Sequence, residues 1–236
     1  MARNIKSEYK EIVKLFDSLT GSRSMWQVFN DCIEMFACAL QNQYEFGKRY
    51  NTLESRYLDI IKQYSKEEVK TIVVIFSELI EMADEKPFRD LLGDLYMQLD
   101  MGSDALGQFF TPYDVAQLTV MVSINIEEVK KEIDEKGYIT VNEPSCGGGA
   151  NIIAFLECLH NNGINYQEKC VVVCQDLSRL TALMCYVVLS LLGCPAVIKV
   201  GDTLAKPFTN YINEVKEDSE LWTTPMFHLK NCYDKC

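Results

Sequence analysis

The first hundred residues have the hydrophobic pattern of α-helices. Apolar side chains recur every three or four residues near the start of the chain, at Ile5, Tyr9, Ile12, Leu15 and Phe16. This spacing places them on one helical face. The same spacing predicts further helices over residues 25–40, 50–64 and 88–99. Ser65 and Glu68 form a capping box before another apolar helical run that reaches Ile80. We therefore predict an all-helical N-terminal region over residues 1–104.

Beyond residue 105 the pattern changes to short apolar runs that alternate with helices. Thr111 suits the N-cap and Pro112 the first position of a helix, and a charged helix over 127–136 stops at Gly137. Strands are predicted over 138–141, 171–173 and 196–200, with helices between them over 152–159 and 180–192. This alternation predicts a parallel sheet with right-handed crossovers. The continuous apolar run Val171–Val173 is typical of a strand that is covered on both faces.

Three loops with candidate chemistry follow the three predicted strands. The glycines of Glu143–Ala150 allow a tight turn and a close approach to a ligand, and the helix N-terminus behind them favours a carboxylate or a phosphate. Asp176 stands where a carboxylate accepts hydrogen bonds from ribose hydroxyls. Asp202 is placed to accept from an adenine amino group. The structural alternatives are a plain tight turn, an N-cap role in competition with Ser178, and a turn aspartate. All three loops follow strands of one sheet, and doubly wound sheets bind ligands at the carboxyl ends of their strands.

The loops occur in an order and spacing that one family shares. The chain reads Gly-Gln-Phe-Phe-Thr-Pro at 107–112, Glu-Pro-Ser-Cys-Gly-Gly-Gly at 143–149, Gln-Asp at 175–176 and Gly-Asp-Thr-Leu at 201–204. Over about residues 90–204 this series resembles the modification subunits of type I restriction systems and related adenine-N6 DNA methyltransferases. Glu143 replaces the family's common Asp, and Gly148 replaces a Ser. The resemblance implies an α/β fold, with a partial Rossmann-like sheet of the S-adenosylmethionine methyltransferases behind the helical N-terminal region.

The resemblance also implies which residues hold S-adenosylmethionine. The methionine end of this cofactor would be contacted by one loop, made of Gln108, Phe109, Phe110, Thr111 and Pro112. Its amino-acid moiety would be held by Glu143 and the turn after it, with Pro144, Cys146, Gly147 and Gly149. Asp176 would bind the ribose and Leu177 would pack on the adenine. Asp202 would read the adenine amino group, and Thr203 belongs to the same loop. A nicotinamide dinucleotide is a weaker interpretation, because the turn is not GxGxxG and the Gln-Phe-Phe-Thr-Pro loop stays unexplained.

The catalytic tetrapeptide of the family has no clear counterpart in the sequence. In the family, Asn-Pro-Pro-(Tyr/Phe) follows the fourth strand; its Asn and a proline carbonyl accept from the target amino group, and its ring stacks on the flipped base. The nearest match in place makes Thr224, Pro225 and Phe227 the catalytic candidates. The structural alternative is a turn in which Trp222 and Phe227 pack on the core. Few residues follow Leu204, so we expect the methyltransferase-like domain, residues 105–236, to be incomplete and its sheet to be covered by the helical region or by a partner.

Charge and cysteine content narrow the expected partners. The formal net charge is −11, whereas a protein that grips DNA alone presents a basic face. We expect DNA contact only through a partner subunit, and a protein partner or a homo-oligomer.

No apolar run reaches the ~20 residues of a membrane span, and the N-terminus has no signal-peptide core, so a cytoplasmic location without a membrane segment is expected. The ten cysteines contain no paired CxxC motifs, and no metal is expected. Small buried hydrophobes are predicted at Cys32, Cys38, Cys158, Cys185 and Cys194, and Cys232 and Cys236 are predicted to be free thiols in the tail.

Three functions follow from these patterns. The favoured hypothesis is an S-adenosylmethionine-binding protein of the adenine-N6 DNA methyltransferase family, related to restriction–modification, that is catalytically degenerate or depends on a partner. The second is an active methyltransferase that modifies N6 of adenine in DNA, with Phe227 as the stacking ring. The third is a helical interaction protein whose vestigial methyltransferase fold binds neither cofactor nor DNA. Whether the chain is an enzyme stays open at this point.

Overall fold

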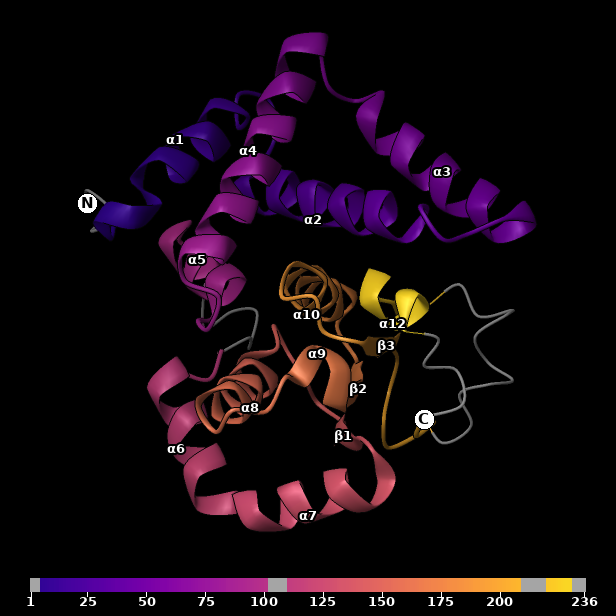
Figure 1. Ribbon diagram of the computed structural model, residues 1–236. Coiled ribbons are helices and arrows are strands. Elements are labelled where there is room, and N and C mark those ends of the chain that lie inside the picture. The colour runs from indigo at the N-terminus through magenta and orange to yellow at the C-terminus, as the bar shows by residue number, and fades with distance from the viewer. Residues whose placement is uncertain (1–4, 102–109, 209–219, 231–236) are drawn as a thin grey trace.

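The computed structural model describes residues 5–101, 110–208 and 220–230 (Figure 1). Its N-terminal half consists of helices: η1 (Ser7–Tyr9), α1 (Lys10–Ser18), α2 (Met25–Gln41), α3 (Gly47–Ile61), α4 (Lys66–Glu85) and α5 (Leu91–Gln98). The predicted helices are therefore confirmed within residues 5–101. The capping box is also confirmed, because the Ser65 hydroxyl accepts from the Glu68 N–H and the Glu68 carboxylate accepts from the Ser65 N–H. The predicted boundary at residues 104 and 105 lies outside the described residues.

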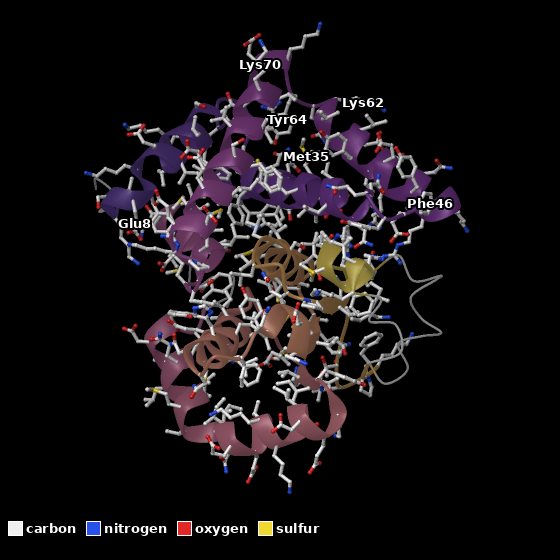
Figure 2. All side chains as sticks on the ribbon, in the orientation of Figure 1. Glu8, Met35, Phe46, Lys62, Tyr64 and Lys70 are labelled. Atoms are coloured by element: carbon white, nitrogen blue, oxygen red, sulfur yellow. The ribbon has the colours of Figure 1, made fainter. Side chains whose placement is uncertain are left out.

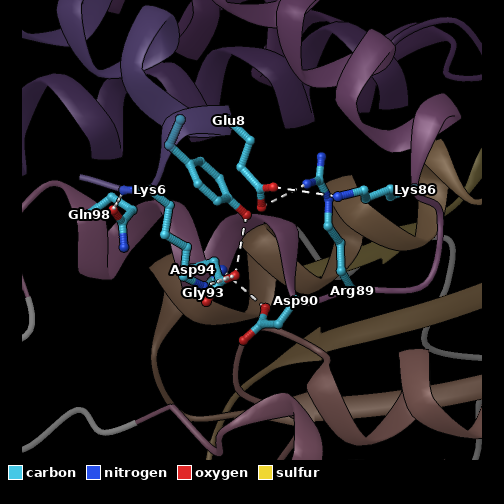
Figure 3. Close-up of polar contacts among 9 residues, drawn as sticks. Lys6, Glu8, Lys86, Arg89, Asp90, Gly93, Asp94 and Gln98 are labelled. Carbon is cyan, nitrogen blue, oxygen red and sulfur yellow. Dashed lines mark hydrogen bonds and ion pairs between the residues drawn. The ribbon is translucent and has the colours of Figure 1, made fainter. Parts of the chain in front are cut away.

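Polar contacts fix the start of the chain to α5 (Figure 3). The Lys6 ammonium lies 2.9 Å from the Asp94 carboxylate, and the Lys6 N–H donates to Gln98. Glu8 pairs with Lys86 and Arg89 at the end of α4. Exposed pairs of this kind contribute little stability each. Their effect is to hold the N-terminal segment, the end of α4 and the start of α5 in one arrangement. The helices η1 and α1 to α5 together form the helical layer. Figure 2 shows Glu8 at this junction and Phe46 at the far end of the helical layer.

The C-terminal half contains one four-stranded sheet. Its strands are β1 (Ile139–Glu143), β2 (Cys170–Asp176), β3 (Ala196–Val200) and β4 (Leu221–Thr223), in the order β1-β2-β3-β4. The first three strands are parallel, as predicted. The fourth pairs antiparallel with β3, opposite Lys199, Ile198 and Val197. The sheet is therefore mixed: the three predicted strands are parallel, and the antiparallel β4 is a strand that the sequence pattern does not predict.

Among the described residues, the helices of this half are α6 (Tyr113–Ser123), α7 (Ile126–Lys136), α8 (Ala150–Asn161), α9 (Tyr166–Lys169), α10 (Arg179–Leu191) and α12 (Pro225–Leu229). Gly137, in the left-handed region at φ 85°, ends α7 as predicted. The start of α6 differs by one residue from the prediction. Pro112 has extended backbone angles and is the N-cap, so Thr111 lies before the helix and is not its cap.

The two faces of the sheet are covered differently. The face that carries Cys170, Val172 and Ile198 belongs to one large core, which also contains residues of α1, α2, α8 and α10. In this core α2 packs on α10 (Figure 1), and the Gln41 side chain at the end of α2 also forms hydrogen bonds with the N–H and hydroxyl of Thr223 in β4. The opposite face has a small separate cluster, formed by Val171, Val197, Leu221 and Phe227. Both halves of the chain thus share a continuous hydrophobic interior.

An ion-pair network crosses the junction between the helical layer and the sheet. The Arg179 guanidinium, at the start of α10, pairs with Glu34 on α2 at 2.6 Å and with Glu220 before β4. Arg56 on α3 adds a second cation beside Glu220. The network ties α2, α10 and β4 to one another.

None of the helices among the described residues has the length and apolarity that crossing a membrane requires.

Candidate functional site

A cavity of about 390 Å³ opens at the carboxyl edge of the parallel strands. This volume is typical of sites for small molecules. Its walls come from three segments, namely the stretch before α6, the glycine loop after β1 and the turn after β2. The lining residues are Phe110, Thr111, Ser145, Cys146, Gly147, Gly148, Ala150, Asn151, Asp176, Leu177, Ser178 and Thr181. Segments separated by up to seventy residues therefore form one site.

Asp176, the last residue of β2, organises the floor of the cavity. One carboxylate oxygen accepts from the Gly147 N–H at 2.7 Å. The other accepts from the Ser178 N–H at 2.9 Å and from the Thr181 hydroxyl at 3.0 Å. These bonds fix the glycine loop to the start of α10. Since an ionised carboxylate has about four acceptor positions, one position remains for a hydroxyl or amino group of a ligand.

Glycine is required in the loop for two different reasons. Gly147 and Gly149 have φ values of +52° and +99°, which favour glycine. A Cβ on Gly148 would lie 3.3 Å from the Phe110 ring, so a side chain there would press on that ring. The Phe110 ring also meets Tyr96 of α5 edge to face, with 5.1 Å between ring centroids. The ring is thus held between the helical layer and the glycine loop.

The charges and surfaces around the cavity are of three kinds. Ala150 and Asn151 begin α8, whose first N–H groups have no partner within the helix and favour an anion. The Asp176 carboxylate favours hydrogen-bond donors. Leu177 is 73% exposed and lines the cavity, so an apolar surface is available there. A ligand that fits has a carboxylate or phosphate, hydroxyl or amino donors, and a flat apolar part.

The loop after β3 lies beside the cavity and does not line it. The Asp202 side chain is exposed and accepts from the N–H groups of Leu204 and Ala205, at 2.9 and 3.2 Å. In this structure Asp202 is a turn aspartate outside the cavity lining, and its role in reading the adenine amino group stays a prediction. Thr203 is also outside the cavity, but its hydroxyl donates to the Pro144 carbonyl at 2.6 Å. This bond joins the third loop to the first.

The candidates for catalysis lie at the opposite edge of the sheet. Because β4 is antiparallel, its C-terminal end reaches the N-terminal end of β3, where the Thr224 N–H donates to Ala196 and the Thr224 hydroxyl to Cys194. Phe227 is fully buried in the small cluster on the sheet. Pro225 begins α12 beside them. The structure thus places Thr224, Pro225 and Phe227 away from the cavity, in a packed C-terminal turn, and lends no support to their predicted catalytic role.

The remaining predicted residues divide into three groups. Six line the cavity: Phe110, Thr111, Cys146, Gly147, Asp176 and Leu177. Four support its walls from outside: Pro112, Glu143, Pro144 and Gly149. Among these, Glu143 accepts from the Ser145 N–H and from the Asn151 amide, so it braces the glycine loop. Gln108 and Phe109 lie outside the described residues.

Sequence reasoning missed six lining residues: Ser145, Gly148, Ala150, Asn151, Ser178 and Thr181. Ser145, Gly148 and Ala150 belong to the glycine motif and follow from it. Ser178 was considered only as an N-cap, which it is, since its hydroxyl accepts from Thr181. Asn151 and Thr181 occupy the first turns of α8 and α10. Their signal is a polar side chain at the start of a helix behind a ligand loop.

Comparison with known proteins agrees with the arrangement of these loops. A search of curated proteins finds no match. A family model described as N-6 DNA methylase matches residues 88–230, more than half of the chain. The matched region includes α5, the whole cavity and all four strands. The chain therefore belongs to the N-6 DNA methylase family.

Proposed function

We propose that this protein binds S-adenosylmethionine in the cavity at the carboxyl edge of the sheet. The observation that carries the proposal is the convergence of three segments, Phe110–Thr111, the glycine loop and Asp176–Leu177, on one hollow. Members of the N-6 DNA methylase family generally use this cofactor. When bound, it would supply a methyl group on a sulfonium centre.

The residues present fit the parts of the cofactor. The N-terminus of α8, with Asn151, would bind the methionine carboxylate. The free acceptor position of Asp176 would take a ribose hydroxyl, and the exposed Leu177 would pack on the adenine. Phe110 and Thr111 would cover the methionine end of the cofactor. In this assignment the three parallel strands correspond to the front half of a methyltransferase sheet.

We propose further that this chain alone does not transfer the methyl group. Its sequence has no Asn-Pro-Pro-(Tyr/Phe), and the nearest substitute is buried at the other edge of the sheet. A partner subunit would then supply the acceptor for the adenine amino group and the basic surface for DNA, which a chain of net charge −11 does not offer. On this proposal the protein is a partner-dependent or catalytically degenerate member of a restriction–modification system.

Calorimetry with S-adenosylmethionine tests cofactor binding, and Leu177→Ala sharpens the test. We expect saturable binding to the wild type and about tenfold weaker binding to the variant, since covering a leucine side chain contributes about 1.5 kcal/mol or more. Val115→Ala, on the exposed face of α6, is the matched control. Absence of binding at millimolar cofactor, or equal affinities for a nicotinamide dinucleotide and S-adenosylmethionine, would contradict the proposal.

Transfer of a tritiated methyl group to unmethylated DNA tests the second part. We expect no incorporation above background with this chain alone, because its sequence has no Asn-Pro-Pro-(Tyr/Phe) to accept from the adenine amino group. The measurement is repeated with wild-type protein that calorimetry has shown to bind the cofactor. Incorporation by the chain alone would show that it is a complete enzyme and overturn the requirement for a partner.

A further inference from the structure

Three cysteine thiols lie together directly behind the wall of the cavity. Cys146 follows β1, Cys174 is in β2 and Cys185 is in α10. Their sulfur atoms lie within 4.8 Å of one another, and those of Cys174 and Cys185 are 3.9 Å apart. All three are buried, but Cys146 also lines the cavity. The cluster therefore has a route to solvent through the proposed cofactor site.

The spacing of the three sulfurs matches a metal site. A cation such as Zn²⁺ binds thiolate sulfur at about 2.3 Å, so three sulfurs at tetrahedral positions around it would be about 3.8 Å apart. The observed separations need only small movements of the side chains to reach this value. Thiolates select soft cations over Mg²⁺ or Ca²⁺. We propose that Cys146, Cys174 and Cys185 bind one thiophilic cation of the Zn²⁺ class, with a fourth coordination position open to the cavity.

Surrounding contacts hold two of the ligands in place. The Cys146 N–H donates to the Gln175 carbonyl at 3.0 Å, and its carbonyl accepts from the Gly149 N–H at 2.9 Å. A Cβ on Gly149 would lie 3.2 Å from the Cys185 sulfur, so the glycine leaves room for that thiol. A cation on these sulfurs would link the glycine loop, β2 and α10. The Asp176 carboxylate already links the same three elements through its hydrogen bonds to Gly147, Ser178 and Thr181.

Binding should depend on pH, because the cation displaces protons. The contact with the Cys146 thiol and burial raise the pKa of Cys174 well above its ordinary value. Because the cation replaces the thiol protons, metal affinity rises as the pH increases. Asp176 is the charged group that faces Cys146 and Cys185, and its charge opposes ionisation of both thiols.

Titration of the reduced, metal-free protein with Cd²⁺ tests this site without S-adenosylmethionine. We expect an ultraviolet thiolate-to-cadmium charge-transfer band that saturates at one ion per chain, with proton release. Cys146→Ala, Cys174→Ala and Cys185→Ala should each weaken binding by more than about 100-fold, since even changes outside the ligand shell cost 10–100-fold. Circular dichroism of the metal-free variants checks folding, and Cys146→Ala, at the cavity wall, carries the test if a deeper variant unfolds.

Two control variants separate this cluster from the other thiols. Cys32→Ala/Cys38→Ala removes two buried thiols of α2, and Cys232→Ser/Cys236→Ser removes two near the C-terminus. Both controls should retain the band at one ion per chain. The proposal is overturned if the wild type gives no band, if all three single variants keep it, or if a control variant abolishes it. None of these outcomes depends on whether the cavity binds the cofactor.

Discussion

Replacing Asp176 by alanine should weaken S-adenosylmethionine binding by at least about 100-fold. The carboxylate anchors Gly147, Ser178 and Thr181 and offers its remaining acceptor position to the ligand. Hydrogen bonds to a charged group contribute about 1.5–3 kcal/mol each, and losing two of them corresponds to about two powers of ten in affinity. Calorimetry on the purified variant gives the dissociation constant. The rise in melting temperature that the cofactor causes is a second readout.

Asp202→Ala is the matched control for Asp176→Ala. It removes the same side chain from the next loop, where the carboxylate caps only its own turn. Substitutions at such exposed positions usually change free energies by no more than about 0.5 kcal/mol, so affinity should stay within about threefold of the wild type. Equal losses in the two variants would mean that Asp202 reaches the cofactor and that the cavity described above is not the complete site.

Replacing Phe227 by alanine should lower the free energy of unfolding by about 3–4 kcal/mol and leave cofactor affinity unchanged. The ring is fully buried against Val171, Val197 and Leu221, on the sheet face away from α10. Truncating a buried phenylalanine removes its transfer free energy and leaves a void. Denaturant unfolding gives the change in stability, and calorimetry below the transition gives the affinity.

Phe46→Ala provides the comparison for a phenylalanine that packs little. This side chain is 85% exposed at the edge of the helical layer (Figure 2). Its removal should change stability by no more than about 0.5 kcal/mol. If Phe227→Ala instead unfolds at the wild-type midpoint and no longer binds the cofactor, the ring belongs to a functional site and its structural role is refuted.

Helices and parallel strands could be predicted because their signals are periodic and local. The apolar spacing from Ile5 to Phe16 and the run Val171–Val173 each reflect which side chains must be buried. The three residues of β4 carry no such period. Their pairing with β3 depends on contacts across a long stretch of sequence, so neither the strand nor its direction could be read from the chain.

The dependence on strand pairing also explains why two aspartates that look alike in sequence occupy different places relative to the cavity. Asp176 and Asp202 both follow apolar strands and look equivalent in sequence. In the sheet, Asp176 is the last paired residue of β2, opposite Val200, whereas Asp202 lies two residues past that level and curls into its own turn. Register decides which carboxylate reaches the cavity.

The thiol cluster shows what only the fold brings together. Cys146, Cys174 and Cys185 have no common spacing in the sequence, where Cys146 belongs to the glycine motif and Cys185 to an apolar helical run. The parallel pairing of β1 with β2, and the packing of α10 on β2, place their sulfurs side by side. The expectation of a chain without a metal site rested on the absence of paired CxxC motifs.

A crystal structure of the protein soaked with S-adenosylmethionine tests the central claim most directly. The account predicts density for the cofactor with its carboxylate at the start of α8, a ribose hydroxyl on the Asp176 carboxylate and the adenine against Leu177. Density for the cofactor anywhere else on the molecule, or an empty cavity in a crystal equilibrated well above the calorimetric dissociation constant, would contradict it.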